Sequence, residues 1–125
     1  MTRSFDTSDT NVVTTPGGQR VHKWHAAQSD VVRADFYEVR SGVWCLVGNG
    51  LSNQTFIEAP EGIIAVDTGE SIEEMREALR RLREVTAAPI AAVIYTHFHY
   101  VEGTKAILEE GNHAIPLPIY GHEKI

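Results

Sequence analysis

Two almost wholly apolar runs, "GIIAVD" at 62–67 and "IAAVIYT" at 90–96, constrain the fold of this chain more than any other feature. Such runs are typical of strands buried on both faces of a sheet. An amphipathic helix is predicted between them, because Ser71 and Glu74 form a capping-box pattern. Four apolar residues follow at helical spacing, which are Ile72, Met75, Leu79 and Leu82. The order strand, helix, strand predicts a sheet that is covered by helices on at least one face.

Further β-rich runs surround this centre. "FYEVRSGVWCLVG" holds two short runs around a turn at Ser41-Gly42, and "TFIEA" is separated from the run at 62–67 by the turn residues Pro60-Glu61-Gly62. "GTKAILEEG" predicts a short helix that Gly111 ends, and "LPIYG" predicts a last strand. The fold class is therefore α/β with a mixed sheet. Residues 1–20 are polar and aperiodic and are expected to be a flexible arm, with the domain at 21–125.

Bulk properties exclude several classes of function. The 125 residues carry a net charge of -6, which argues against nucleic acid as a partner, because that binding depends on Lys and Arg. Cys45 is the single cysteine and cannot form an internal disulfide. No apolar run approaches the ~18 residues of a membrane span, and no signal-peptide stretch is present, so a cytoplasmic protein is expected.

The stretch "YTHFHYVEG" at 95–103 is the candidate chemical site. His97 and His99 follow a buried strand, where α/β sheets tend to keep their sites, and in an extended segment both imidazoles point the same way and can share one metal ion. Phe98 and Tyr100 would then point away from that ion. Glu102 has three alternatives: a third ligand, a general base on metal-bound water, or a carboxylate favoured at a helix start.

At these residues the sequence resembles the metallo-β-lactamase-fold hydrolases, and among them the alkyl-sulfatase-like branch. The resemblance runs collinearly over residues 36–125, through "LSNQTFIEAPEGIIAVDTG", "SIEEMREALRRLRE", "AVIYTHFHYVEG" and "LPIYGHEKI". Family members hold one or two metals with Thr-His-x-His-x-Asp-His. Thr96, His97 and His99 match this motif, whereas Val101 stands in place of the Asp and Glu102 in place of the last His. The departure affects the ligands of the second metal.

The resemblance also implies the rest of the architecture. The family fold is a four-layer αββα sandwich of two similar halves, and this chain resembles the first half alone. The other half is expected from a separate polypeptide, a continuation of the chain or a second copy of it. A separate subunit is favoured because the chain begins at Met1 and ends at Ile125 without a tag. A large apolar face that needs a partner is therefore expected.

The expected function is a metal-dependent hydrolase subunit, one half of a heterodimer, that aims metal-activated water at an ester. The ester is a sulfate ester, a phosphoester, a lactone or a thioester. His97, His99 and Glu102 are the predicted metal ligands, and Glu102 and Asp67 the predicted catalytic residues. Asp67, in "VDTG", either orients a ligand histidine or caps a turn. Zinc is the expected ion, with manganese or iron as alternatives. A non-catalytic fold-completing or regulatory subunit and a mononuclear iron oxygenase are the other hypotheses.

Overall fold

The computed structural model describes residues 8–125, and the chain forms two compact units, Met1–Arg33 and Ala34–Ile125. The first unit holds a 3-10 helix, η1 (Asp9–Asn11), a hairpin of β1 (Val12–Thr14) and β2 (Arg20–His22), and helix α1 (Lys23–Val31). Composition predicts a boundary at residue 20, whereas the structure places it after Arg33, because β2 pairs with β1 across the predicted boundary. Flexibility of the arm stays a prediction, and its first seven residues lie outside the described part.

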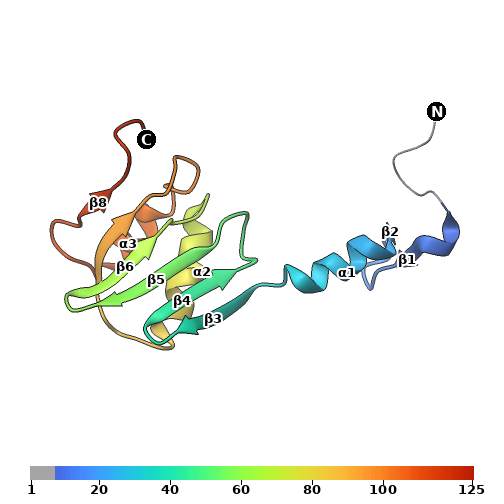
Figure 1. Ribbon diagram of the computed structural model, residues 1–125, viewed down its shortest axis with the longest axis horizontal. Coiled ribbons are helices and arrows are strands. Elements are labelled where there is room, and N and C mark those ends of the chain that lie inside the picture. Colours follow the sequence, from blue (N-terminus) through green and yellow to red (C-terminus); the bar gives the residue numbers. More distant parts are fainter. Residues whose placement is uncertain (1–7) are drawn as a thin grey trace. The chain divides into compact units, whose positions relative to one another are not determined.

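The second unit is built on a six-stranded mixed sheet whose strand order follows the chain (Figure 1). The first four strands pair with one another in antiparallel fashion: β3 (Asp35–Arg40), β4 (Val43–Val47), β5 (Gln54–Ala59) and β6 (Gly62–Val66). β7 (Ile90–Ile94) and β8 (Ile119–Tyr120) continue the sheet parallel to β6. The predicted α/β class with a mixed sheet is confirmed, and so are the turn at Ser41-Gly42 and the helix between the two apolar runs.

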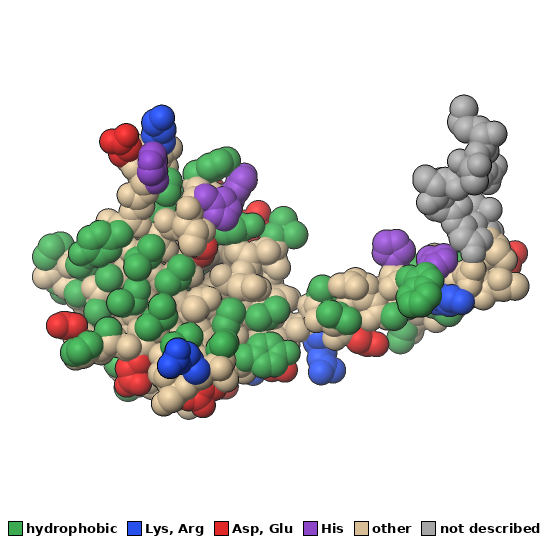
Figure 2. Space-filling view, in the orientation of Figure 1, with side chains coloured by type: hydrophobic (Ala, Val, Ile, Leu, Met, Phe, Trp, Pro, Cys, Tyr) green, Lys and Arg blue, Asp and Glu red, His purple; other side chains and the backbone are tan. Residues whose placement is uncertain are grey.

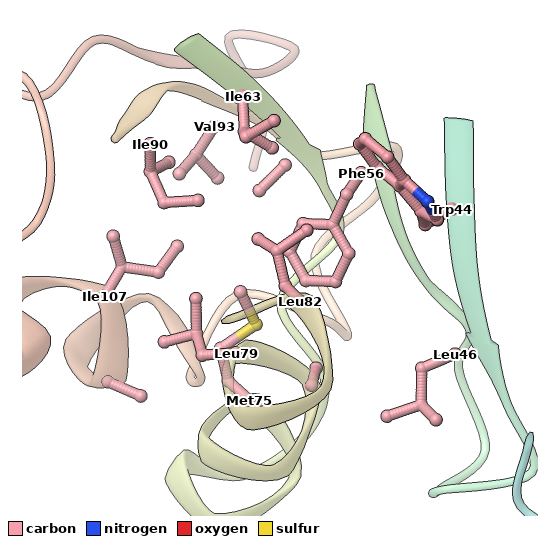
Figure 3. Close-up of a cluster of buried hydrophobic side chains, with 13 residues drawn as sticks. Trp44, Leu46, Phe56, Ile63, Met75, Leu79, Leu82, Ile90, Val93 and Ile107 are labelled. Carbon is pink, nitrogen blue, oxygen red and sulfur yellow. The ribbon is translucent and has the colours of Figure 1, made fainter. Parts of the chain in front are cut away.

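Two helices, α2 (Ile72–Arg83) and α3 (Thr104–Glu110), cover one face of this sheet (Figure 1). The side chain of Ser71 accepts a hydrogen bond from the backbone N–H of Glu74, as the capping box predicts. In Figure 3 the α2 side chains Met75, Leu79 and Leu82 point toward the sheet, where Phe56 is fully buried. No helix of residues 8–125 is long and apolar enough to cross a membrane.

The opposite face of the sheet is apolar and only half-buried. Strand register places Val43, Ile57, Ile64 and Ala92 in one row across β4 to β7, while the alternate residues of the same strands are buried under the helices. A second row adds Tyr37, Cys45, Thr55, Val66, Ile94 and Tyr120. We call these two rows the open face. Hydrophobic side chains gather over this unit in the space-filling view (Figure 2), whereas a sheet face in water is ordinarily polar.

Candidate metal centre

The loop Tyr95–Gly103, here the histidine loop, connects β7 to α3 and carries the predicted ligands. It folds back over the residues that follow β6. The backbone N–H of Asp67 donates to the carbonyl of Ile94 at 2.9 Å, and that of Thr68 donates to the carbonyl of Tyr100 at 2.8 Å. The Thr68 hydroxyl donates to the same carbonyl at 3.0 Å. The loop is consequently a turn at Phe98 and His99, and not the extended segment that its sequence pattern predicts.

This turn gathers four aromatic side chains. The ring centroids of His97 and His99 lie 5.2 Å apart, with the planes at 80°. The Tyr100 ring lies 4.6 Å from that of His97, and the Phe98 ring lies 3.9 Å from that of His99. Phe98 and Tyr100 therefore pack against the imidazoles instead of pointing away from them, because a turn does not keep the alternation of a strand.

The spacing of the two imidazoles is compatible with a shared ion. A ring nitrogen lies about 2.0–2.1 Å from a bound zinc, so two imidazoles at tetrahedral positions have centroids roughly 5 Å apart. The number of ligands is incomplete, however. Among residues 8–125, no group of three or more His, Cys, Asp and Glu side chains is close enough to hold an ion. The chain thus brings the two predicted histidine ligands together, without a third such side chain beside them among its described residues.

Asp67 is buried, with 9% of its surface exposed, and it has a positive φ of 56° directly after β6. Its carboxylate accepts two hydrogen bonds from Thr96, one from the backbone N–H at 2.9 Å and one from the hydroxyl at 2.7 Å. The same hydroxyl lies 2.8 Å from Nδ1 of His97. Asp67 is therefore linked to a predicted ligand through one intermediate side chain.

Glu102 lies at the end of the histidine loop and is exposed to solvent. It comes two residues before α3, whose N-cap is Gly103. The structure does not bring Glu102 into a three-ligand group with His97 and His99. Its three predicted roles of ligand, base and helix-start carboxylate stay predictions.

Sequence reasoning missed the residues that hold the loop in place. Thr68 is fully buried, and its hydroxyl also contacts that of Thr104 at 3.2 Å. Gly103 packs so closely on Thr68 that no side chain fits there. Thr96 links Asp67 to His97, and its position directly before the first histidine was the one signal available in the sequence.

Known proteins resemble this chain in sequence over the same region. A sequence model of the metallo-β-lactamase superfamily matches residues 47–100, which extend from the end of β4 into the histidine loop. A linear primary-alkylsulfatase from Pseudomonas sp. is 50% identical over 56 residues, which are 43% of this chain and 11% of that protein. The match to the family model ends just before Val101 and Glu102, where this chain departs from the motif.

Solved structures share the fold. The stereoselective inverting sec-alkylsulfatase Pisa1 from Pseudomonas sp. superposes with a TM-score of 0.64 at 20% identity, over 90% of this chain and 21% of that one. A metallo-β-lactamase from Erythrobacter litoralis in its mono-zinc form superposes with a TM-score of 0.52 at 26% identity, over 71% of this chain and 44% of that one. The chain spans less than half of each of these relatives. It is an alkylsulfatase-like protein of the metallo-β-lactamase fold that contains a part of that domain.

Proposed function

We propose that this chain is part of a metal-dependent hydrolase that cleaves sulfate esters. The observation that carries the proposal is the pair His97 and His99, which lie at the spacing of two ligands of one ion. The similarity to a linear primary-alkylsulfatase favours an alkyl sulfate as the substrate. Phosphoesters, lactones and thioesters need the same chemistry and are the other substrates to test. Zinc is the proposed ion, with manganese and iron as alternatives.

The roles of the chain's own residues follow from their contacts. A bound divalent ion supplies a water molecule whose pKa is lowered to about 7, and hence a hydroxide near neutral pH. His97 and His99 offer neutral imidazole nitrogens to that ion. Tyr100 and Phe98 pack on the two rings and restrict their rotation. Glu102 is exposed at the end of the histidine loop and is the proposed general base or third ligand.

The remaining ligands are proposed to come from a second polypeptide, or a second copy of this chain, that packs on the open face. The row Val43, Ile57, Ile64 and Ala92 is apolar across four strands but only half-buried. Removing such a surface from water stabilises an assembly, and large exposed apolar patches commonly mark interfaces. The incomplete ligand set supports the same proposal.

A non-catalytic subunit is the second candidate function. The Val101 side chain has no metal-binding atom, and Glu102 does not join the two histidines in a three-ligand group. A fold-completing or regulatory role needs the open face but no ion. The two candidates therefore differ in whether the purified assembly contains a stoichiometric metal.

Elemental analysis of the purified assembly, together with sulfate release from a linear primary alkyl sulfate, tests the hydrolase. We expect one or more divalent ions per chain. His97→Ala should lose the ion and reduce activity at least about a hundredfold, since even residues behind the ligands contribute 10–100-fold to metal affinity or activity. His122→Ala is the matched control, because His122 is exposed and its Nδ1 only accepts a bond from the Lys124 N–H. An assembly without stoichiometric metal, in which His97→Ala changes nothing, supports the non-catalytic subunit instead.

Light scattering tests the partner. We expect the purified chain to associate, and Ile57→Lys to abolish that association, because the substitution places a charge in the middle of the open face. Glu58→Lys is the control, since it adds a lysine one residue along, at an exposed position on the other side of the strand. A monodisperse monomer of about 14 kDa from the wild-type chain alone contradicts association with a second copy, and the partner is then a separate polypeptide.

A further inference from the structure

The hydroxyl of Thr96 stands between a carboxylate and an imidazole. Its Oγ1 atom lies 2.7 Å from Oδ2 of Asp67 and 2.8 Å from Nδ1 of His97. The other carboxylate oxygen, Oδ1, accepts the Thr96 backbone N–H at 2.9 Å. Asp67 is nine-tenths buried, and the hydrogen bond from its own N–H to Ile94 fixes it in the turn. The three side chains thus form a continuous line from the buried carboxylate to the ring.

The direction of the hydrogen bonds in this line is determined by proton counting. A hydroxyl has one proton to donate, and a carboxylate can only accept. The Thr96 proton must therefore point to Asp67, so that its oxygen is left as an acceptor toward His97. A neutral imidazole meets that acceptor by carrying its proton on Nδ1, and then Nε2 carries the lone pair.

We infer that Asp67, acting through Thr96, is a positioning residue that fixes His97 in its Nδ1–H tautomer and leaves Nε2 as the metal-ligating atom. Ligating histidines are commonly oriented by a hydrogen bond from their second nitrogen. Here the Asp67 carboxylate does not touch the His97 ring. It fixes the direction of the Thr96 hydroxyl proton, and this leaves the hydroxyl oxygen as an acceptor for the ring. The consequence for metal binding rests on the proposed function, whereas the tautomer itself does not.

The other histidines provide internal references. His99 has ring contacts but no hydrogen-bond partner among residues 8–125. Nδ1 of His113 lies 2.7 Å from the carbonyl of Ala114 and must donate to it, which is the same tautomer as the one inferred for His97. Nδ1 of His122 accepts the Lys124 N–H at 3.3 Å, which requires the opposite tautomer, with the proton on Nε2. Both tautomers are therefore represented in one molecule.

Long-range ¹H–¹⁵N correlation spectra of the ¹⁵N-histidine-labelled, metal-free chain at pH 8, above the usual histidine pKa of about 6.5, report each tautomer directly. The expected pattern for His97 is Nδ1–H in the wild type and in Thr96→Ser, which keeps the hydroxyl. Thr96→Val removes the hydroxyl and should leave His97 as a mixture. Asp67→Asn should invert the tautomer to Nε2–H, because its amide donates to Thr96 and turns the hydroxyl proton toward the ring. Asn tolerates the positive φ at this position.

An Nε2–H pattern at His97 in the wild type overturns the inference, and so does a His97 pattern that is the same in Thr96→Val and Thr96→Ser. Unchanged signals of His113 and His122 certify that each variant is folded. A zinc titration of the assembly then separates the two proposals. If wild type binds zinc, Asp67→Asn should bind it 10–100-fold more weakly. If wild type binds no zinc while the tautomers are as expected, the proposed function fails and the positioning role stands.

Discussion

Gly103 offers the sharpest test of how the candidate site is built. Its φ of −66° is ordinary, so no conformational strain requires glycine there. Space requires it, because a Cβ atom at this position would lie 1.8 Å from the carbonyl oxygen of Thr68 and 2.7 Å from Cβ of Met75. Real Cβ atoms essentially never come within 3.0 Å of such neighbours. Gly103→Ala must therefore push the histidine loop away from Thr68 by roughly 1.2 Å.

That displacement has a calculable cost. It opens the two hydrogen bonds from Thr68 to the Tyr100 carbonyl and the contact of Thr68 with Thr104, all at a buried position. Each lost bond costs about 1 kcal/mol, and the overpacking itself costs about 1–3 kcal/mol. We expect Gly103→Ala to reduce the free energy of unfolding by about 4–6 kcal/mol, a large fraction of the stability of a small domain.

Urea unfolding of the whole chain, followed by far-ultraviolet circular dichroism, measures this loss. Gly111→Ala is the matched control, because Gly111 has a φ of 76° but open space around the position of a Cβ atom. That control should cost only the roughly 1–2 kcal/mol of a left-handed alanine. A Gly103→Ala variant that loses no more stability than Gly111→Ala would refute the argument from space.

Three further predictions concern α2. Leu82 is fully buried, so Leu82→Ala should reduce the free energy of unfolding by about 2–5 kcal/mol in the same urea assay. Hydrogen bonds from Arg80 lower the pKa of Glu77 to about 2 from 4.5, so the ionised carboxylate stabilises the fold above about pH 4.5 and this contribution is lost as the pH falls toward 2. Glu77→Gln should therefore make the free energy of unfolding, measured with urea, less sensitive to acid. The difference from wild type should be less than about 1 kcal/mol, because the ion pair with Arg80 is partly exposed. Arg83 donates to both carboxylate oxygens of Glu110 at 2.7 Å, so Arg83→Met should reduce the free energy of unfolding by about 1–3 kcal/mol. Arg76 is more exposed, and Arg76→Met should reduce it by less than about 1 kcal/mol.

The sheet and helices could be predicted because they follow from local periodicity. The apolar spacing of α2 and the two apolar runs specify which side chains are buried without reference to distant residues. The geometry of the histidine loop could not be predicted in the same way. Its turn depends on hydrogen bonds from Thr68, which lies 32 residues before Tyr100 in the chain, and no local pattern contains such a contact. The extended conformation expected for His97 and His99 was wrong for that reason.

The same dependence bears on the meaning of Val101 and Glu102. A site that had lost its chemistry would need only those contacts that also stabilise the fold, such as the packing of Gly103 on Thr68. The chain instead retains the buried Asp67, its two bonds to Thr96 and the glycine that permits close packing on Thr68. Of these features, the bonds from Asp67 to Thr96 continue to His97, the first histidine of the motif. The departure from the family motif is therefore confined to the second set of ligands, which favours a single-ion site completed by a partner over a site that has decayed as a whole.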